Sequence, residues 1–394
     1  MRGWGEKFSE ALRGSGSAQV YTGEEEEGGE AGAMEGGIRI LNPNALLHSY
    51  IPPRLPHREE EYEDLLKEYK IASYGLPPSH MIVLGPPGSG KTVTIRKALR
   101  DSGVPHVYLV SEPTAYGTLV ALAGVLLGKR LWGLSFAPLW NSIEGELPER
   151  CVLVLDEADR FMMNDKKSDL LLYYLSRRDG LSLTLVSNRA NLVDYIKDAR
   201  VKSSLKPKVK FFKPYGAEEL EEIIRSRARE ALGDDFERFF ELEAIRLMAA
   251  LAAQRGGDAR YSIDLLRESI TSALYSGSDI VRVGHVEEAR INIEKAEFES
   301  SMRSLSRTHK LMLLCALNSK KVGEAYSRFN ALAPNYGLMP LSERRLREVF
   351  GDLELMGFIS AERRGKEWVI IPSAWFDVAK AKEVLEKELT SFMR

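Results

Sequence analysis

Cysteine is scarce in this chain of 394 residues, in which only Cys151 and Cys315 occur. Two cysteines cannot build a disulfide framework, which fits a reducing compartment. Cysteine and histidine also lack the spacing of a metal site, so zinc is not expected. Glutamine occurs only twice, a bias found in thermophilic proteins, which avoid labile amides.

Long uncharged apolar runs are absent as well. A transmembrane helix needs about 20 such residues, and the first residues, MRGWGEKFSEALRGSG, lack the apolar segment of a secretory signal. The chain has 44% hydrophobic and 28% charged residues, which excludes a wholly disordered, collagen-like or coiled-coil protein. We therefore expect a cytoplasmic globular protein of two to four domains with no membrane partner.

The formal net charge of −2 is unevenly distributed. Residues 1–38 hold three basic residues, eight glutamates and ten glycines, for a local charge of −5. Such a segment buries too little apolar surface to offset its ordering entropy, so we expect a disordered acidic Gly-rich tail. A solvated tail and a segment that binds a basic partner are both compatible with this composition.

Residues 39–213 show the alternation of strands and helices that predicts an α/β domain with a parallel sheet. After a Pro-rich stretch, Leu41–Pro56, and a helical pattern, Glu59–Tyr74, four apolar runs are separated by helical patterns. The runs are Met81–Leu84, His106–Val110, Cys151–Leu155 and Leu183–Val186. Beyond Pro214 no further strand is expected until the C-terminal block. Residues 214–297 carry helical spacing over Ala217–Ala231, Leu242–Arg255, Ile263–Tyr275 and Val286–Ser301.

A phosphate-binding loop follows the first apolar run. The segment GPPGSGKT at residues 85–92 matches GxxxxGK[ST] and stands between a strand and a helical pattern, Val93–Arg100. Its backbone N–H groups and the helix N-terminus bind phosphate, Lys91 is expected to reach the β- and γ-phosphates, and Thr92 to complete a Mg²⁺ shell. The residues expected to hold ATP or ADP here are Gly85, Pro86, Pro87, Gly88, Ser89, Gly90, Lys91, Thr92 and Val93.

Two carboxylates follow the third apolar run. Asp156 is expected to hold Mg²⁺, directly or through water, and Glu157 to orient and activate the water that attacks the γ-phosphate. Acids after a strand can also simply open a helix. Asn188 ends the fourth run, where an amide can bind both the γ-phosphate and the water, although asparagine is common in turns. Downstream, Arg260 could close over the nucleotide or remain a surface charge.

These motifs, in this order, resemble the AAA+ ATPases. More narrowly, the chain resembles the archaeal origin-recognition and Cdc-type replication initiators. The pieces that carry the narrower resemblance are LPHRE at 55–59, RVKSSL at 200–205 and a C-terminal block that resembles a winged helix. The resemblance covers about residues 39–394.

The resemblance implies roles for several residues. Asn188 would be sensor 1, Arg260 sensor 2, and Arg200 an arginine finger that serves a neighbouring subunit. Arg200 follows a helical pattern at Leu192–Ala199. Residues 214–297 would form the lid, and the adenine pocket would be lined by Ile51–Leu55 and Tyr215. The family also implies an initiator-specific helical insertion within Pro113–Glu144, and the apolar segment Leu119–Leu134 there fits either that insertion or a core helix.

The C-terminal block, 298–394, is the more basic end of the chain, with a charge of +4 from Leu305 onward. Its pattern predicts three helices, two short strands around Gly365 and a last helix. Ser342 is a candidate N-cap for Glu343–Leu355, whose predicted buried stripe is Leu346, Val349, Phe350 and Leu353. The basic residues expected to contact DNA are Arg344, Arg345 and Arg347 on the helix, and Arg363, Arg364 and Lys366 at the hairpin tip.

The resemblance implies an ATP-regulated replication initiator with slow, switch-like hydrolysis. Its expected partners are duplex origin DNA, the replicative helicase, and a second copy or a related chain, so we expect it to associate with the nucleoid. Two other classes stay open, because one ATPase core serves many tasks. One is a clamp-loader-like or helicase-loader ATPase whose C-terminus binds protein only, and the other is a transcriptional or signalling ATPase with a winged helix.

Overall fold

The computed structural model describes residues 37–71, 74, 79–365, 367–373 and 377–391. The described chain forms two compact units, which divide between Val286 and Glu287. Apart from Gly37 and Ile38, the tail predicted over residues 1–38 lies outside the described residues. The boundaries at 213/214 and 297/298 stay predictions.

A five-stranded parallel sheet forms the centre of the first unit. Its strand order is β2-β3-β4-β1-β5. The strands are β1 (Met81–Leu84), β2 (His106–Val110), β3 (Cys151–Asp156), β4 (Leu181–Ser187) and β5 (Lys208–Phe211). The first four coincide with the predicted apolar runs, with β4 longer than predicted. The fifth was not predicted, because its mostly exposed Lys-Val-Lys-Phe sequence is that of a charged edge strand and forms no apolar run.

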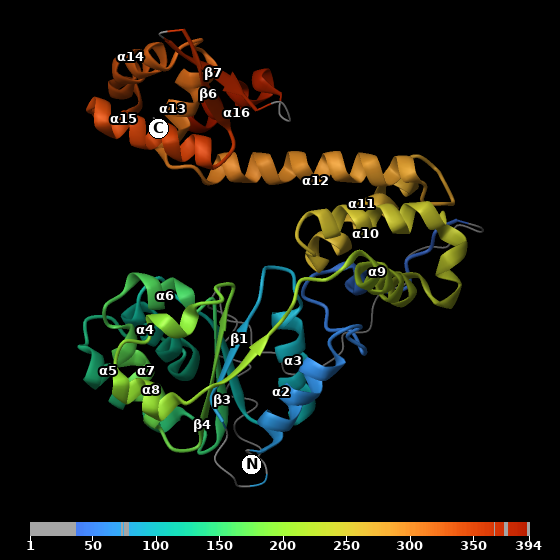
Figure 1. The fold of residues 1–394 in the computed structure, drawn as a ribbon, viewed down its shortest axis with the longest axis vertical. Helices are drawn as coiled ribbons and strands as arrows, with labels where there is room; N and C mark the ends of the chain where they lie inside the picture. The colour runs from blue at the N-terminus through green and yellow to red at the C-terminus, as the bar shows by residue number, and fades with distance from the viewer. Residues whose placement is uncertain (1–36, 72–73, 75–78, 366, 374–376, 392–394) are drawn as a thin grey trace. The chain divides into compact units, whose positions relative to one another are not determined.

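Helices cover both faces of this sheet, so successive strand residues enter different cores (Figure 1). On one face α2 (Glu59–Ile71) and α3 (Lys91–Ser102) pack with Met81 and Val83. On the other face Ile82 and Leu84 pack with the second helix set. That set comprises α4 (Ala115–Leu127), α5 (Phe136–Ile143), α6 (Asp159–Asn164), α7 (Ser168–Arg177) and α8 (Ala199–Leu205). Burial on both faces explains why the central strands read as continuous apolar runs.

The apolar segment Leu119–Leu134 is split by the structure. Helix α4 ends at Leu127, and Gly128 takes the left-handed conformation with φ 69°. Leu119, Leu122 and Val125 are buried in the core of the first unit, as the core-helix interpretation expects. Beyond the helix, Trp132 is 63% exposed, so the remainder of the segment belongs to the surface.

The helical region after the sheet is confirmed as a bundle. It contains α9 (Ala217–Leu232), α10 (Leu242–Gln254), α11 (Ala259–Tyr275) and the start of the long α12 (Val283–Ser304). Helix α11 begins at Ala259, four residues before the apolar spacing at Ile263, because Asp258 caps it, accepting hydrogen bonds from the N–H groups of Arg260 and Tyr261. This early start places Arg260 in the first turn of the helix.

The second unit has the predicted order of helices and strands. It contains α13 (Arg307–Leu317), α14 (Val322–Leu332), α15 (Glu343–Leu355), β6 (Ile359–Arg364), β7 (Glu367–Pro372) and α16 (Val378–Ser391). The Ser342 side chain caps α15 through the N–H of Arg345. All four residues of the predicted stripe of α15 are buried in the core of this unit. Strands β6 and β7 pair antiparallel as the wing.

Candidate functional site

The phosphate-binding loop joins β1 to α3 and packs against the lid. Gly88 has φ 70°, and a Cβ there would lie 1.8 Å from Oδ1 of Asp258. Gly90 has φ 89°, and a Cβ there would lie 2.5 Å from the hydroxyl of Tyr215. The N–H of Ala259 also donates to the carbonyl of Gly88 at 3.1 Å. The loop therefore needs glycine both for its backbone angles and for its close contact with the lid.

Lys91 lies across the loop with its ammonium group turned inward. Its Nζ donates to the carbonyls of Gly85 and Pro86, both at 2.7 Å, and to Oδ1 of Asn188 at 2.9 Å. Burial lowers the pKa of Lys91 to about 8. A buried cation whose pKa is lowered in this way is stabilised by an anion, so the loop is suited to phosphate. The same contact brings Asn188, the predicted sensor 1, to the loop.

An oxygen pair suited to a divalent cation lies beside the loop. The Thr92 hydroxyl is 3.2 Å from Oδ2 of Asp156 at the end of β3. Tyr108 on β2 donates to the same carboxylate oxygen, a contact that the sequence did not indicate. Burial, with the neighbouring Asp156 charge, raises the pKa of Tyr108 well above its usual value, which keeps the phenol protonated as a donor. Hydroxyl and carboxylate oxygens are the ligands that Mg²⁺ prefers, so these residues fit the cation.

Glu157 follows Asp156 in a left-handed backbone conformation, with φ 53°. Such a conformation costs free energy in a residue other than glycine and is concentrated at functional sites. The carboxylate is about half exposed and lies 3.3 Å from Nη1 of Arg160. Glu157 therefore lies at the exposed edge of the site, whereas the Asp156 carboxylate is held by Thr92 and Tyr108.

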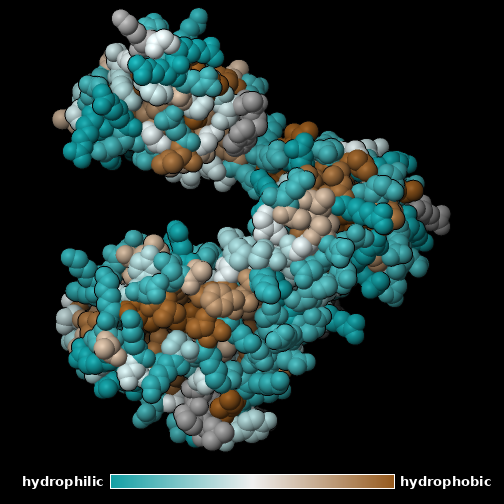
Figure 2. Space-filling view, viewed as in Figure 1, coloured by the Kyte–Doolittle hydropathy of each residue, from teal (hydrophilic) through white to brown (hydrophobic). Residues whose placement is uncertain are grey.

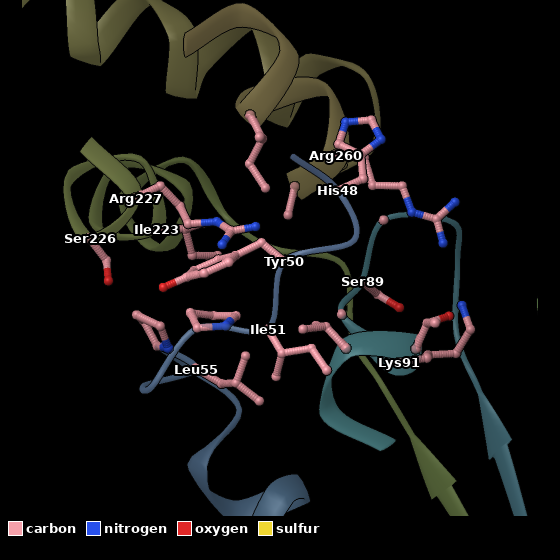
Figure 3. Close-up of a pocket in the computed structure, with 18 of the residues that line it drawn as sticks. His48, Tyr50, Ile51, Leu55, Ser89, Lys91, Ile223, Ser226, Arg227 and Arg260 are labelled. Carbon is pink, nitrogen blue, oxygen red and sulfur yellow. The ribbon is translucent and has the colours of Figure 1, made fainter. Parts of the chain in front are cut away.

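Both ends of the nucleotide site border one cavity of about 350 Å³ (Figure 3). Lys91 and Ser89 lie near one end, and Tyr50, Leu55 and Arg227 lie toward the other. The predicted residues that line the cavity are Ile51, Leu55, Gly88, Ser89, Gly90, Lys91, Thr92, Val93, Tyr215 and Arg260. Arg54, within the predicted range Ile51–Leu55, also lines the cavity, whereas the sequence missed His48, Tyr50, Arg96, Ile223 and Arg227.

Arg58 is a further residue that the sequence did not single out, although it lies within LPHRE. Its side chain is only 4% exposed, and it donates to the carbonyls of Ser89 at 2.9 Å and Lys213 at 2.5 Å. Its guanidinium stacks on the Tyr215 ring, with 3.9 Å between the guanidinium carbon and the ring centroid. Arg58 therefore ties the phosphate loop to the segment that enters the lid.

Replacing Arg58 with Met should lower the free energy of unfolding by about 3 kcal/mol, because buried carbonyls lose a charged donor. ATP affinity should fall as well, since the loop and the lid segment lose their shared anchor. Lys67→Met, at an exposed cation of α2, is the control. Urea unfolding and nucleotide titration measure the two effects. An unchanged urea midpoint of unfolding in Arg58→Met would show that Arg58 does not stabilise the fold.

The structure does not bring Arg200 to this cavity. The Leu192–Ala199 helix expected before it is wrong: Leu192–Tyr195 is a 3-10 helix, and α8 begins at Ala199 with Asp198 as its N-cap. The polar Asp198 interrupts the helix by capping a new one. Arg200 is 72% exposed, and its Nη2 lies 2.7 Å from Oδ2 of Asp198. This ion pair lowers the pKa of Asp198 to about 2.

The predicted DNA-contacting arginines of α15 are exposed and already paired within the helix. Arg344 and Arg345 contact Glu348 at 3.3 and 2.7 Å, and Arg347 pairs with Glu343. On the wing Arg363 is exposed and Arg364 lies 3.6 Å from Glu362, whereas Lys366 lies outside the described residues. Figure 2 shows a hydrophilic surface where Figure 1 draws α15. A duplex would have to compete with these carboxylates for the arginines.

The parallel sheet, the phosphate loop, the lid and the C-terminal winged helix together define a P-loop ATPase of the AAA+ class. Residues 77–196 match the family described as an AAA domain, and residues 221–291 match the Cdc6 AAA+ ATPase-type lid domain. Residues 300–368 match the Cdc6 C-terminal winged helix domain.

Relatives narrow the class to one family. The chain is 32% identical over 363 residues to an ORC1-type DNA replication protein of Methanothermobacter thermautotrophicus, covering 88% of this chain and 97% of that protein. It is also 32% identical to ORC1-type DNA replication protein 1 of Archaeoglobus fulgidus, covering 81% and 83%. The chain therefore belongs to the family of ORC1-type DNA replication initiators.

Solved structures agree with this assignment. The Aeropyrum pernix ORC1 protein in complex with DNA matches with a TM-score of 0.77 and 29% identity, over 90% of this chain and 99% of that one. The Aeropyrum pernix ORC2 protein in its ADPNP-ADP complexes shares the fold with a TM-score of 0.53 and 17% identity, covering 90% of this chain and 99% of that one. No helix in the described part of this chain is long and apolar enough to span a membrane.

Proposed function

We propose that this chain is an ATP-regulated replication initiator that binds duplex origin DNA and helps to recruit the replicative helicase. The observation that carries the proposal is the pairing, in one chain, of a lid-bordered phosphate site with a winged helix that exposes three arginines on α15. Its similarity to a relative solved with DNA supports the DNA-binding half. The proposed domains are the ATPase core at 39–213, the lid at 214–297 and the winged helix at 298–394.

The arrangement assigns a task to each residue of the nucleotide site. The loop N–H groups and Lys91 bind the phosphates of ATP or ADP, and Thr92 and Asp156 would hold Mg²⁺, which would supply positive charge to the phosphates. Glu157 accepts a proton from the attacking water, Asn188 orients that water against the γ-phosphate, and Arg260 contacts the phosphates from the lid. Because Arg260 and Lys91 belong to different parts of the unit, bound ATP would hold the lid against the core. If hydrolysis is slow, the protein would stay in this ATP-bound state until the γ-phosphate is cleaved, and so would act as a nucleotide-controlled switch.

The winged helix divides the work of DNA binding between α15 and the wing. Arg344, Arg345 and Arg347 are placed to enter the major groove, where a base-reading arginine replaced by Ala should cost about 1–3 kcal/mol on the cognate site. Arg363 and Arg364 should contact phosphates, so their loss should weaken all duplexes alike and lower the salt slope by about 0.9 per contact. Titrations of cognate and scrambled duplex at several salt concentrations measure both effects.

Lys387→Ala, at an exposed cation of α16, is the matched control for these titrations. The i,i+4 pairing of the α15 arginines with Glu343 and Glu348 favours a second candidate, a loader whose C-terminus docks on protein. If neither the α15 variants nor the wing variants change binding to the cognate or the scrambled duplex, the result would favour that loader.

Arg200 is proposed to act on the ATP of a neighbouring subunit, either a second copy or a related chain. Its exposure, and the fact that it does not line this chain's own cavity, support that role. Trans-acting fingers contribute about 10³–10⁵ in rate elsewhere, and a slow switch should show less. Mixing Arg200→Ala with Glu157→Gln protein should restore turnover, because each variant supplies what the other lacks. Intact turnover of assembled Arg200→Ala alone would make the residue a surface charge.

A further inference from the structure

Arg227 is a buried arginine of α9 that has a spare hydrogen-bond donor. Its side chain lines the cavity and is only 5% exposed. Nη2 donates to the carbonyl of Leu47 at 3.1 Å, whereas Nη1 is buried and has no hydrogen-bond partner in the part of the chain that the structure describes. The guanidinium carbon lies 4.9 Å from the centroid of the Tyr50 ring.

A guanidinium group is charged at all physiological pH values and carries five N–H donors. Leaving a buried charged donor unsatisfied is costly, so native proteins keep such a group where water or a ligand supplies the acceptor. Burial also lowers the pKa of Arg227 from its usual value, which shows how fully this cation has lost its solvent. Nη1 of Arg227 therefore lacks an acceptor among the described residues.

The position of Arg227 identifies that acceptor. Figure 3 shows Arg227 and Tyr50 far from Lys91 within the cavity, and Ile51 and Leu55 on the same side as Tyr50. A nucleotide whose phosphates lie on Lys91 would bring its base, the one remaining polar aromatic part, to this end. Adenine offers three unprotonated ring nitrogens, N1, N3 and N7, any of which accepts a hydrogen bond.

We propose that Arg227 recognises the base, with Nη1 donating a hydrogen bond to a ring nitrogen of adenine while Tyr50 lies against the same end of the cavity. This inference rests on the proposed ATP site and names a residue that recognises the base there. The contact joins α9 of the lid to the base, so recognition of the base and lid position would be coupled through one side chain.

The test uses the full-length protein, stripped of nucleotide, and titrates it with ATP and with 1-deaza-, 3-deaza- and 7-deaza-ATP. Each analogue replaces one ring nitrogen by C–H and leaves the rest of the nucleotide intact. In the unmodified protein one analogue should bind about tenfold or more weakly than ATP, the effect of a hydrogen bond to a charged donor. In Arg227→Met, ATP and that analogue should bind equally, because the donor is absent.

Arg229→Met, at a largely exposed arginine of the same helix, is the control and should keep the difference between ATP and the analogue. Circular dichroism and thermal unfolding check that Arg227→Met is folded. If Arg227→Met does not fold, Arg227→Lys replaces it as a milder change with a shorter donor, and it should reduce the difference in affinity between ATP and the analogue. Equal binding of all three analogues and ATP to the unmodified protein would overturn the inference. A difference that is undiminished in Arg227→Met or Arg227→Lys would also overturn it. Failure of the ATP site itself looks different, since ATP would then not bind or would bind equally well to Lys91→Ala.

Discussion

Lys91→Ala should lose at least about 100-fold in ATP affinity, the effect of removing one partner from a buried charge pair. The ammonium group is the cation that the structure holds inside the loop, on the carbonyls of Gly85 and Pro86 and on Asn188. Without it the β- and γ-phosphates would keep the backbone N–H groups of the loop but lose the loop's own cation. Calorimetric titration of nucleotide-free protein with ATP measures the loss.

Arg100→Ala is the control for this prediction, because Arg100 lies on the same helix and is about half exposed away from the loop. It should bind ATP as the unmodified protein does. ATP affinity that is unchanged in Lys91→Ala would contradict the assignment of the phosphate site.

Glu157→Gln should reduce ATP hydrolysis by about 10²–10⁴-fold while ATP stays bound, since the amide keeps the shape of the carboxylate and cannot take the proton. The Gln side chain would also lose its ion pair with Arg160, but that pair is half exposed and contributes little to stability. Single-turnover hydrolysis and retention of labelled ATP on a filter separate the chemical step from binding. Glu146→Gln, at an exposed acid, is the control and should hydrolyse ATP as the unmodified protein does. Normal turnover in Glu157→Gln would show that another residue is the catalytic base.

Most of the sheet and of the phosphate site could be predicted because both rest on local patterns. A buried central strand needs a run of apolar residues, and a phosphate loop needs glycines at fixed spacing. The edge strand β5 was missed because one side of it faces water, which leaves no apolar run. The break before Arg200 was missed because Asp198 acts there as a helix cap, a role that one polar residue in an apolar pattern does not reveal.

Arg58 and Arg227 were missed for a different reason. Their partners, Lys213 for Arg58 and Leu47 for Arg227, lie more than 150 residues away along the chain, so no local spacing connects them. In the sequence both look like ordinary helix-surface arginines within acidic segments. Only the packing of the N-terminal segment and the lid against the phosphate loop buries them.

Footprinting on genomic DNA of the source organism, with the full-length protein and ATP, tests the central claim most directly. The account predicts protection of a small number of sites that share one sequence. That protection should disappear when Arg344, Arg345 and Arg347 are replaced by Ala, while ATP binding is retained. Absence of any protected sequence, with normal ATP binding by the same preparation, would contradict the initiator assignment and favour a loader that binds only protein.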